Sequence, residues 1–242
     1  MTENPKYIFH GRIYPERTNV YLEPGFTVES DNTRINVKIT ASQIVAEAEF
    51  GDEIENIHTM RNTVEESVYN VTDLFSFVEG YSYTVEITSV VTPDGESHVF
   101  GVTVPALREK SEDMNMSDQV TRILGIQSEL DSDYLHRCFK DLRLSMKDPA
   151  ETGFFCYRSI ETVRKYFQNK YEIDDKKEGW IKMRNELEIE RSKIDSIKEY
   201  ADDRRHGGQV TITGEERADL FSNTWKILDQ FLSYLEKNMS DD

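Results

Sequence analysis

One short segment near the C-terminus combines residue types that could handle a phosphodiester. It reads Asp202-Asp-Arg-Arg-His-Gly-Gly208, with charges of both signs, a histidine and two glycines. Arginines bind phosphate oxygens in bidentate fashion and histidine titrates near neutral pH, so Arg204 and Arg205 could hold a phosphate while His206 moves a proton. Alternatively, these cations simply lie in the last turn of a helix, where the helix dipole favours them. The residues alone favour this second interpretation.

The common cofactor and metal signatures are missing from the sequence. It contains no GxxxxGK[ST] loop, no GxGxxG turn, no HExxH and no GxSxG. The close pair His136 and Cys138 is two residues apart on a predicted helix, where such side chains do not share a face. We therefore predict no cofactor and no metal site. The two cysteines, Cys138 and Cys156, are expected to be reduced core thiols.

The elements that would position the 202–208 segment are helices. From about residue 117 onward, apolar residues recur at steps of three or four in four runs. The third run leads into the 202–208 segment, and Thr213-Gly-Glu-Glu216 before the fourth has the form of a capping box. We expect an antiparallel bundle of four or five helices. The runs are Leu135, Phe139, Leu142 and Met146; Cys156, Ile160, Val163 and Phe167; Met183, Leu187, Ile194, Ile197 and Ala201, as one long helix; and Phe221, Trp225, Leu228, Leu232 and Leu235.

The first 105 residues are spaced like a β-rich domain. Glu23-Pro24-Gly25 and Thr92-Pro-Asp-Gly-Glu96 predict turns, the second of them a hairpin loop. Between about residues 53 and 78, apolar residues recur at steps of three or four up to Val78, which predicts one long amphipathic helix across the sheet. The predicted strands are residues 6–14, 33–39, 43–48, 81–91 and 97–104, all rich in Val, Ile, Thr and aromatic residues.

Net charge differs between the two halves. The chain has 242 residues with 46 acidic and 29 basic ones, a formal charge of −17. Residues 1–105 hold 17 acidic and 6 basic residues (net −11), whereas the remainder holds 29 and 23 (net −6). Such a polyanion does not coat nucleic acid through its overall field, although a local phosphate site remains compatible with it. The acidic first half is the expected docking face for a basic protein partner.

These patterns predict an α+β protein of two domains. We expect an acidic β-rich domain with one long helix at 1–105, a charged linker at 106–118 and a helical bundle at 119–242. No stretch approaches the roughly 18 consecutive apolar residues of a membrane helix, and the first residues lack the pattern of a signal peptide. We expect a cytoplasmic protein without a membrane partner.

The order of elements from Asp133 to Leu235 resembles the HEPN superfamily, in particular its branch with an RHG-type motif. The resemblance covers rather over a hundred residues, most of the helical half and none of the β half. It rests on a helix ending before Asp148-Pro149, on Phe155-Cys-Tyr-Arg-Ser-Ile-Glu161, on a long helix running into Arg205-His206-Gly207, on Ile212-Thr-Gly-Glu-Glu-Arg217 and on Thr224-Trp-Lys-Ile-Leu-Asp-Gln-Phe231.

Proteins of the HEPN superfamily are typically dimeric helical bundles, and many are metal-independent RNases of toxin–antitoxin, abortive-infection and phage-defence systems. The resemblance implies a homodimer through the bundle, with His206 at the RNase histidine position. The usual motif has an arginine separated from this histidine by about four to six residues. That arginine would fall at Glu199, Tyr200 or Ala201, and none of the three is arginine.

Two functions from different classes follow. The first is an interaction or regulatory protein linked to RNA or phage defence, which the missing arginine favours. The second is a metal-independent endoribonuclease that uses His206 as acid or base, with Arg204 and Arg205 holding the phosphate. A third hypothesis is a small-ligand cavity in the β half, lined by its Tyr and Phe residues, although these residues could equally fill a core.

Overall fold

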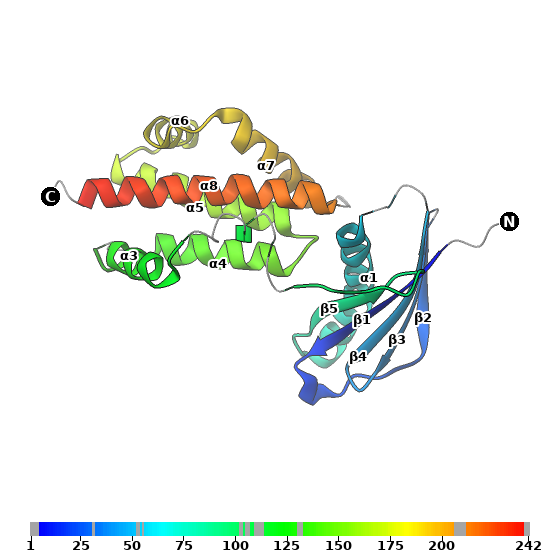
Figure 1. The fold of residues 1–242 in the computed structure, drawn as a ribbon. Helices are drawn as coiled ribbons and strands as arrows, with labels where there is room; N and C mark the ends of the chain where they lie inside the picture. Colours follow the sequence, from blue (N-terminus) through cyan, green and yellow to red (C-terminus); the bar gives the residue numbers. More distant parts are fainter. Residues whose placement is uncertain are drawn as a thin grey trace. The chain divides into compact units, whose positions relative to one another are not determined.

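The computed structural model describes most of the chain. It covers residues 5–30, 32–51, 54, 56–101, 104, 107–108, 114–129, 133–205 and 212–239, with side chains except at 203–205 and 239. The fold is α+β, as predicted, and it divides into two compact units, residues 1–102 and 103–242 (Figure 1). The division lies close to the expected boundary at residue 105.

The first unit is a six-stranded antiparallel sheet with one long helix. The sheet order is β2-β3-β4-β1-β5-β6, and every neighbouring pair is antiparallel. A short helix, η1 (Glu16–Thr18), follows β1, and the predicted 92–96 loop joins β5 to β6 as a hairpin. The strands are β1 (Lys6–Tyr14), β2 (Leu22–Ser30), β3 (Thr33–Thr40), β4 (Gln43–Phe50), β5 (Thr84–Val91) and β6 (Ser97–Val99), and the helix is α1 (Ile57–Glu79).

One face of this sheet is buried under α1, because alternate residues of each strand point to the same face. Val37 of β3 and Ala46 of β4 are buried there against Met60, Val64 and Val68 of α1. The residues that alternate with them on the strands are exposed or half-buried, so the opposite face of the sheet is open to solvent. Asn56 begins α1 by accepting hydrogen bonds from two backbone N–H groups of its first turn.

Two sequence expectations for this unit were wrong. Glu23-Pro24-Gly25 lies inside β2, where the register shifts between Leu22 and Phe26, rather than forming a turn. Proline has no backbone N–H to donate. It is tolerated there because β2 is an edge strand, and at the bulge no hydrogen bond to the neighbouring strand is required from Pro24. Val78, predicted to face the sheet, is 79% exposed. At about 100° per residue, Val78 is rotated roughly 80° around the helix from the buried Val68, and so it lies outside the stripe that faces the sheet.

The second unit is a bundle of helices around one apolar core. In it α5 packs against α4, α7, α8 and α6, and it contributes the buried Ile160, Val163 and Phe167 to the core. The turn between α4 and α5 is held by Asp148, whose side chain accepts from two backbone N–H groups. The helices are α3 (Met116–Glu129), α4 (Tyr134–Lys147), α5 (Thr152–Lys170), α6 (Lys176–Leu187), α7 (Arg191–Arg205) and α8 (Gly214–Met239) (Figure 1).

Two boundaries in this unit differ from the expectation. The predicted third long helix is two helices, α6 and α7, because Glu188 adopts a left-handed conformation with φ of 53° and ends α6. Helix α3 begins at Met116, inside the predicted linker of 106–118. Asn115 explains that start, since its side chain accepts from the backbone N–H groups of Ser117 and Asp118.

The bulge in β2 generates a stability prediction. Gly25 has a φ of +100°, and a Cβ there would lie 2.3 Å from the carbonyl oxygen of Val37. Gly95 has a similar φ of +87° but open space around it, so it controls for backbone strain alone. We expect Gly25→Ala to lower the free energy of unfolding by at least about 3 kcal/mol, against about 1 kcal/mol for Gly95→Ala.

Thermal unfolding followed by circular dichroism measures this difference. Both tryptophans, Trp180 and Trp225, belong to the second unit, so their fluorescence reports separately whether that unit is unaffected. Equal losses in the two alanine variants would contradict a steric requirement for glycine at position 25.

Candidate functional site

Two of the three predicted catalytic residues lie at the end of α7. The backbone places Arg204 and Arg205 as the last two residues of that helix, as the sequence predicted. Their side chains and the whole of His206 lie outside the described residues, so their use in catalysis stays a prediction. The helices that precede and follow residues 206–211, α7 and α8, are described and are in contact.

A hydrogen bond joins α7 to α8. The hydroxyl of Tyr200 on α7 donates to Oε1 of Glu216 on α8 at 2.8 Å. Glu216 also completes the predicted capping box with Thr213: its Oε2 accepts from the Thr213 backbone N–H at 2.8 Å, and its own N–H donates to Oγ1 of Thr213 at 3.2 Å. We name Tyr200, Thr213, Glu216, Arg217 and Gly153 the anchoring corner.

Close packing of α5 on α7 adds to this corner. A Cβ at Gly153, in the first turn of α5, would lie 2.5 Å from Cβ of Tyr200. The glycine therefore permits the two helices to approach at this point. Tyr200 is held between α5 and the Glu216 carboxylate, and burial together with the Glu216 hydrogen bond raises its pKa to about 12.

The buried guanidinium of Arg217 ties α8 to α4 and α5. Its Nε donates to Oγ1 of Thr152 at 2.9 Å, and one terminal nitrogen donates to the carbonyl oxygens of Ser145 and Met146 at 3.2 and 2.6 Å. These carbonyls belong to the last turn of α4, which has no intrahelical donors for them. The ring of Phe221 lies 5.2 Å from the guanidinium. Arg217 is only 8% exposed, which makes it a structural cation.

The corner differs from a phosphate-cleaving site in its charge. Where the resemblance expects an arginine, Tyr200 is hydrogen-bonded to Glu216, Ala201 is fully buried and Glu199 carries the opposite charge. The Thr213 N–H lowers the pKa of Glu216 below its ordinary value, so this carboxylate is ionised at neutral pH. This anion accepts from Tyr200 and so disfavours a phosphodiester beside that tyrosine.

Another motif of the resemblance has a structural role here. Arg158 on α5 donates from Nε to Oδ2 of Asp141 on α4 at 2.9 Å and makes a second contact with Oδ1. Its guanidinium also lies over the rings of Phe154 and Phe155. A bidentate pair of this kind fixes the register of α4 on α5.

The described residues contain neither an exposed thiol nor a cluster of metal ligands. Cys138 and Cys156 are free and buried, and burial raises the pKa of both thiols. Within those residues, no group of three or more His, Cys, Asp and Glu side chains could hold a metal ion. No helix in the described part of the chain is long and apolar enough to cross a membrane.

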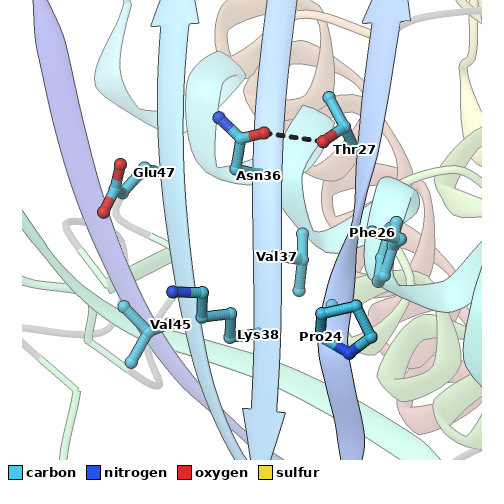
Figure 2. Close-up of a pocket in the computed structure, with 9 residues that line it drawn as sticks. Pro24, Phe26, Thr27, Asn36, Val37, Lys38, Val45 and Glu47 are labelled. Carbon is cyan, nitrogen blue, oxygen red and sulfur yellow. Dashed lines mark hydrogen bonds between the residues drawn. The ribbon is translucent and has the colours of Figure 1, made fainter.

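The open face of the sheet carries a shallow hollow of about 470 Å³ beside the β2 bulge. Figure 2 shows it over β2, β3 and β4, with Thr27 donating to Asn36 at 2.7 Å along one side. Lys38 and Glu47 also line it, and neither makes an ion pair within the described part of the chain. Val45 lies opposite Lys38 in the register and is 39% exposed. The hollow therefore presents two charges of opposite sign beside an apolar side chain.

The C-terminal part of α1 forms a second exposed surface. Leu74, Phe77, Val78 and Tyr81 are 63%, 89%, 79% and 55% exposed, and we name these four residues the α1 patch. Their spacing of three, one and three residues places them on one side of the helix and the turn that follows it. The acidic residues Asp73 and Glu79 are exposed beside them. Contiguous exposed apolar side chains rimmed by charges typically mark an interaction site.

Sequence reasoning missed both the anchoring corner and the α1 patch. Tyr200 and Glu216 are 16 residues apart, and no local pattern pairs them. The patch had a signal, because Leu74, Phe77 and Val78 continue a helical stripe that is rotated from the one formed by Met60, Val64 and Val68.

The anchoring corner generates a stability prediction. Arg217→Met keeps apolar volume but removes the guanidinium donor to the Met146 carbonyl and leaves the Ser145 carbonyl to the Thr152 hydroxyl, so we expect a loss of about 3 kcal/mol in the free energy of unfolding. Arg191→Met removes an exposed pair with Asp195 and should cost less than about 0.5 kcal/mol. Urea unfolding followed by tryptophan fluorescence measures both. A loss below about 1 kcal/mol for Arg217→Met would contradict the structural role of this residue.

Comparisons with known proteins match both units of the chain. A model described as a domain of unknown function (DUF8168), N-terminal domain, matches residues 7–100, and one described as the DUF8168 C-terminal domain matches residues 120–236. No curated protein and no solved structure matches the chain. Neither family description mentions HEPN proteins, so that resemblance stays a hypothesis. The two matches lie one in each structural unit and together span most of the sequence, and the chain therefore belongs to the DUF8168 family.

Proposed function

We propose that this chain is a cytoplasmic binding or regulatory protein that acts by docking on a basic protein partner and assembles as a homodimer. The observation that carries the proposal is the α1 patch, with its four exposed apolar side chains beside Asp73 and Glu79. Burying such side chains contributes roughly 25 cal/mol for each Å² of apolar surface. A link to RNA or phage defence comes from the HEPN resemblance alone.

The charge around the α1 patch defines the chemistry of the partner. The first unit carries most of the net negative charge of the chain, and Asp73 and Glu79 lie at the rim of the patch. A basic amphipathic helix would bury its apolar stripe on the patch while its lysines or arginines meet these carboxylates. Such charges mainly determine orientation and association rate, and the buried apolar groups supply most of the affinity.

A metal-independent RNase is the second candidate function. One observation favours it: Arg205 ends α7 beside the anchoring corner, where α5 and α8 both begin, and helix N-termini favour anions. His206 would then act as acid or base, with Arg204 and Arg205 holding the phosphate. Against it stand the Tyr200–Glu216 hydrogen bond at the expected arginine position and the ionised Glu216.

A basic amphipathic peptide of leucine and lysine tests the proposed docking. We expect the peptide to bind the wild-type protein, and Phe77→Asp to weaken the binding at least about tenfold, because a charge replaces the most exposed apolar side chain of the α1 patch. Fluorescence anisotropy of the labelled peptide measures the dissociation constant. Because Phe77 is 89% exposed, its substitution should leave the fold intact.

The matched control is Tyr21→Asp, an aromatic residue that is 58% exposed in the first unit but lies outside α1. It adds the same charge to the same domain, so it separates a local contact from a change in overall field. Equal weakening by Tyr21→Asp and Phe77→Asp, or no weakening by Phe77→Asp, would contradict docking on the α1 patch.

A further inference from the structure

The open face of the sheet contains charges that form ion pairs and others that form none with the residues that the structure describes. At one end, Glu29, Arg34, Glu49 and Lys6 follow one another across β2, β3, β4 and β1 with alternating sign. Arg34 pairs with Glu29 at 3.1 Å and Lys6 pairs with Glu49 at 3.6 Å. This row is therefore neutralised within the chain.

The centre of the open face is different. Lys38 and Glu47 are exposed there, and within the described part of the chain neither has an ion-pair partner. The register places Lys38 opposite Val45, and Glu47 is two residues further along β4, so the two charges stand diagonally with Val45 beside them. Ile8, opposite Glu47 on β1, is 37% exposed and extends the apolar part of this surface.

This arrangement is complementary to itself. A two-fold axis that lies in the interface and passes close to Val45 exchanges the positions of Lys38 and Glu47. Lys38 of one copy then faces Glu47 of the second copy, and the reverse pair forms at the same time. Val45 meets its own equivalent near the axis. Two sheets can stack in this way about 10 Å apart, with side chains of the facing surfaces interdigitating.

We propose that the open sheet face pairs with the same face of a second copy, through reciprocal Lys38–Glu47 ion pairs around Val45. The inference rests on the homodimer of the proposed function. It places the contact between the two copies on this surface instead of on the helical bundle. The shallow hollow beside the β2 bulge receives side chains of the second copy. A small-molecule site normally encloses most of its ligand, and this shallow hollow does not.

Charge reversal at the two positions tests the inference. Lys38→Glu alone brings two glutamates together at each pair, and Glu47→Lys alone brings two lysines together, so each variant should raise the dissociation constant of the dimer at least about tenfold. The double variant Lys38→Glu/Glu47→Lys restores opposite charges and should return to within about threefold of the wild-type value. Sedimentation equilibrium over a range of protein concentrations measures all four proteins.

Arg17→Glu is the matched control, because Arg17 is exposed in η1 and does not belong to the open sheet face. It makes the same change in net charge as Lys38→Glu and should leave the dimer unchanged. Circular dichroism melting of each variant verifies that the fold persists, which is expected because both side chains are exposed on the sheet.

Three outcomes would overturn the inference. A dimer unaffected by both single reversals would place the pairing surface elsewhere, such as the helical bundle, and would leave the proposed homodimer standing. A double variant as weak as the single ones would show that the two charges do not meet. A wild-type protein that stays monomeric at every concentration would overturn both the inference and the homodimer, while docking on the α1 patch could still be measured separately.

Discussion

The buried guanidinium of Arg217 is the interaction on which the architecture of the second unit depends. It reaches from α8 to the carbonyl ends of α4 and to the first residue of α5, and so connects three helices through one side chain. Removing a buried cation from water is costly unless its donors are satisfied, and these acceptors take hydrogen bonds from Nε and from one terminal nitrogen. The Tyr200–Glu216 hydrogen bond then joins α7 to the same place, so the anchoring corner holds α4, α5, α7 and α8 together.

In the first unit, the comparable constraint is that a sheet has two faces, and among the described residues one long helix, α1, covers one of them. Burial of one face under α1 leaves the other face to solvent, and the bulge in β2 shapes the hollow on that open face. The α1 patch remains exposed because its residues are rotated around α1 away from the stripe formed by Met60, Val64 and Val68. Two surfaces with different chemistry result: an acidic and apolar one on α1, and one of mixed charge on the sheet.

Much of this fold could be predicted from local patterns. The alternation in β1, the capping box at Thr213 and the helical period of α5 each depend on neighbours in sequence, and each is present. The bulge in β2 was mistaken for a turn because proline and glycine break a central strand but are accommodated at an edge, and strand order is not visible locally. The break at Glu188 was missed because the residue in the left-handed conformation is not a glycine.

The candidate site was predictable only in part for the same reason. The 202–208 segment is visible as a cluster of residue types, and its place at the end of α7 followed from the helical period. The pairing of Tyr200 with Glu216 depends on tertiary contacts, and the placement of Lys38 and Glu47 on the open sheet face depends on strand register. Single-sequence patterns determine neither. The Tyr200–Glu216 hydrogen bond and the charges of the open sheet face are also the observations that favour partner binding over RNA cleavage.

The central claim is that the protein binds partners and does not cleave RNA at the anchoring corner. Its most direct test is incubation of purified wild-type and His206→Ala protein with structured and unstructured RNA, without added metal. The account predicts that the wild type cleaves neither RNA beyond the level seen with His206→Ala. Cleavage by the wild type that is abolished in His206→Ala would contradict it and would establish the RNase function.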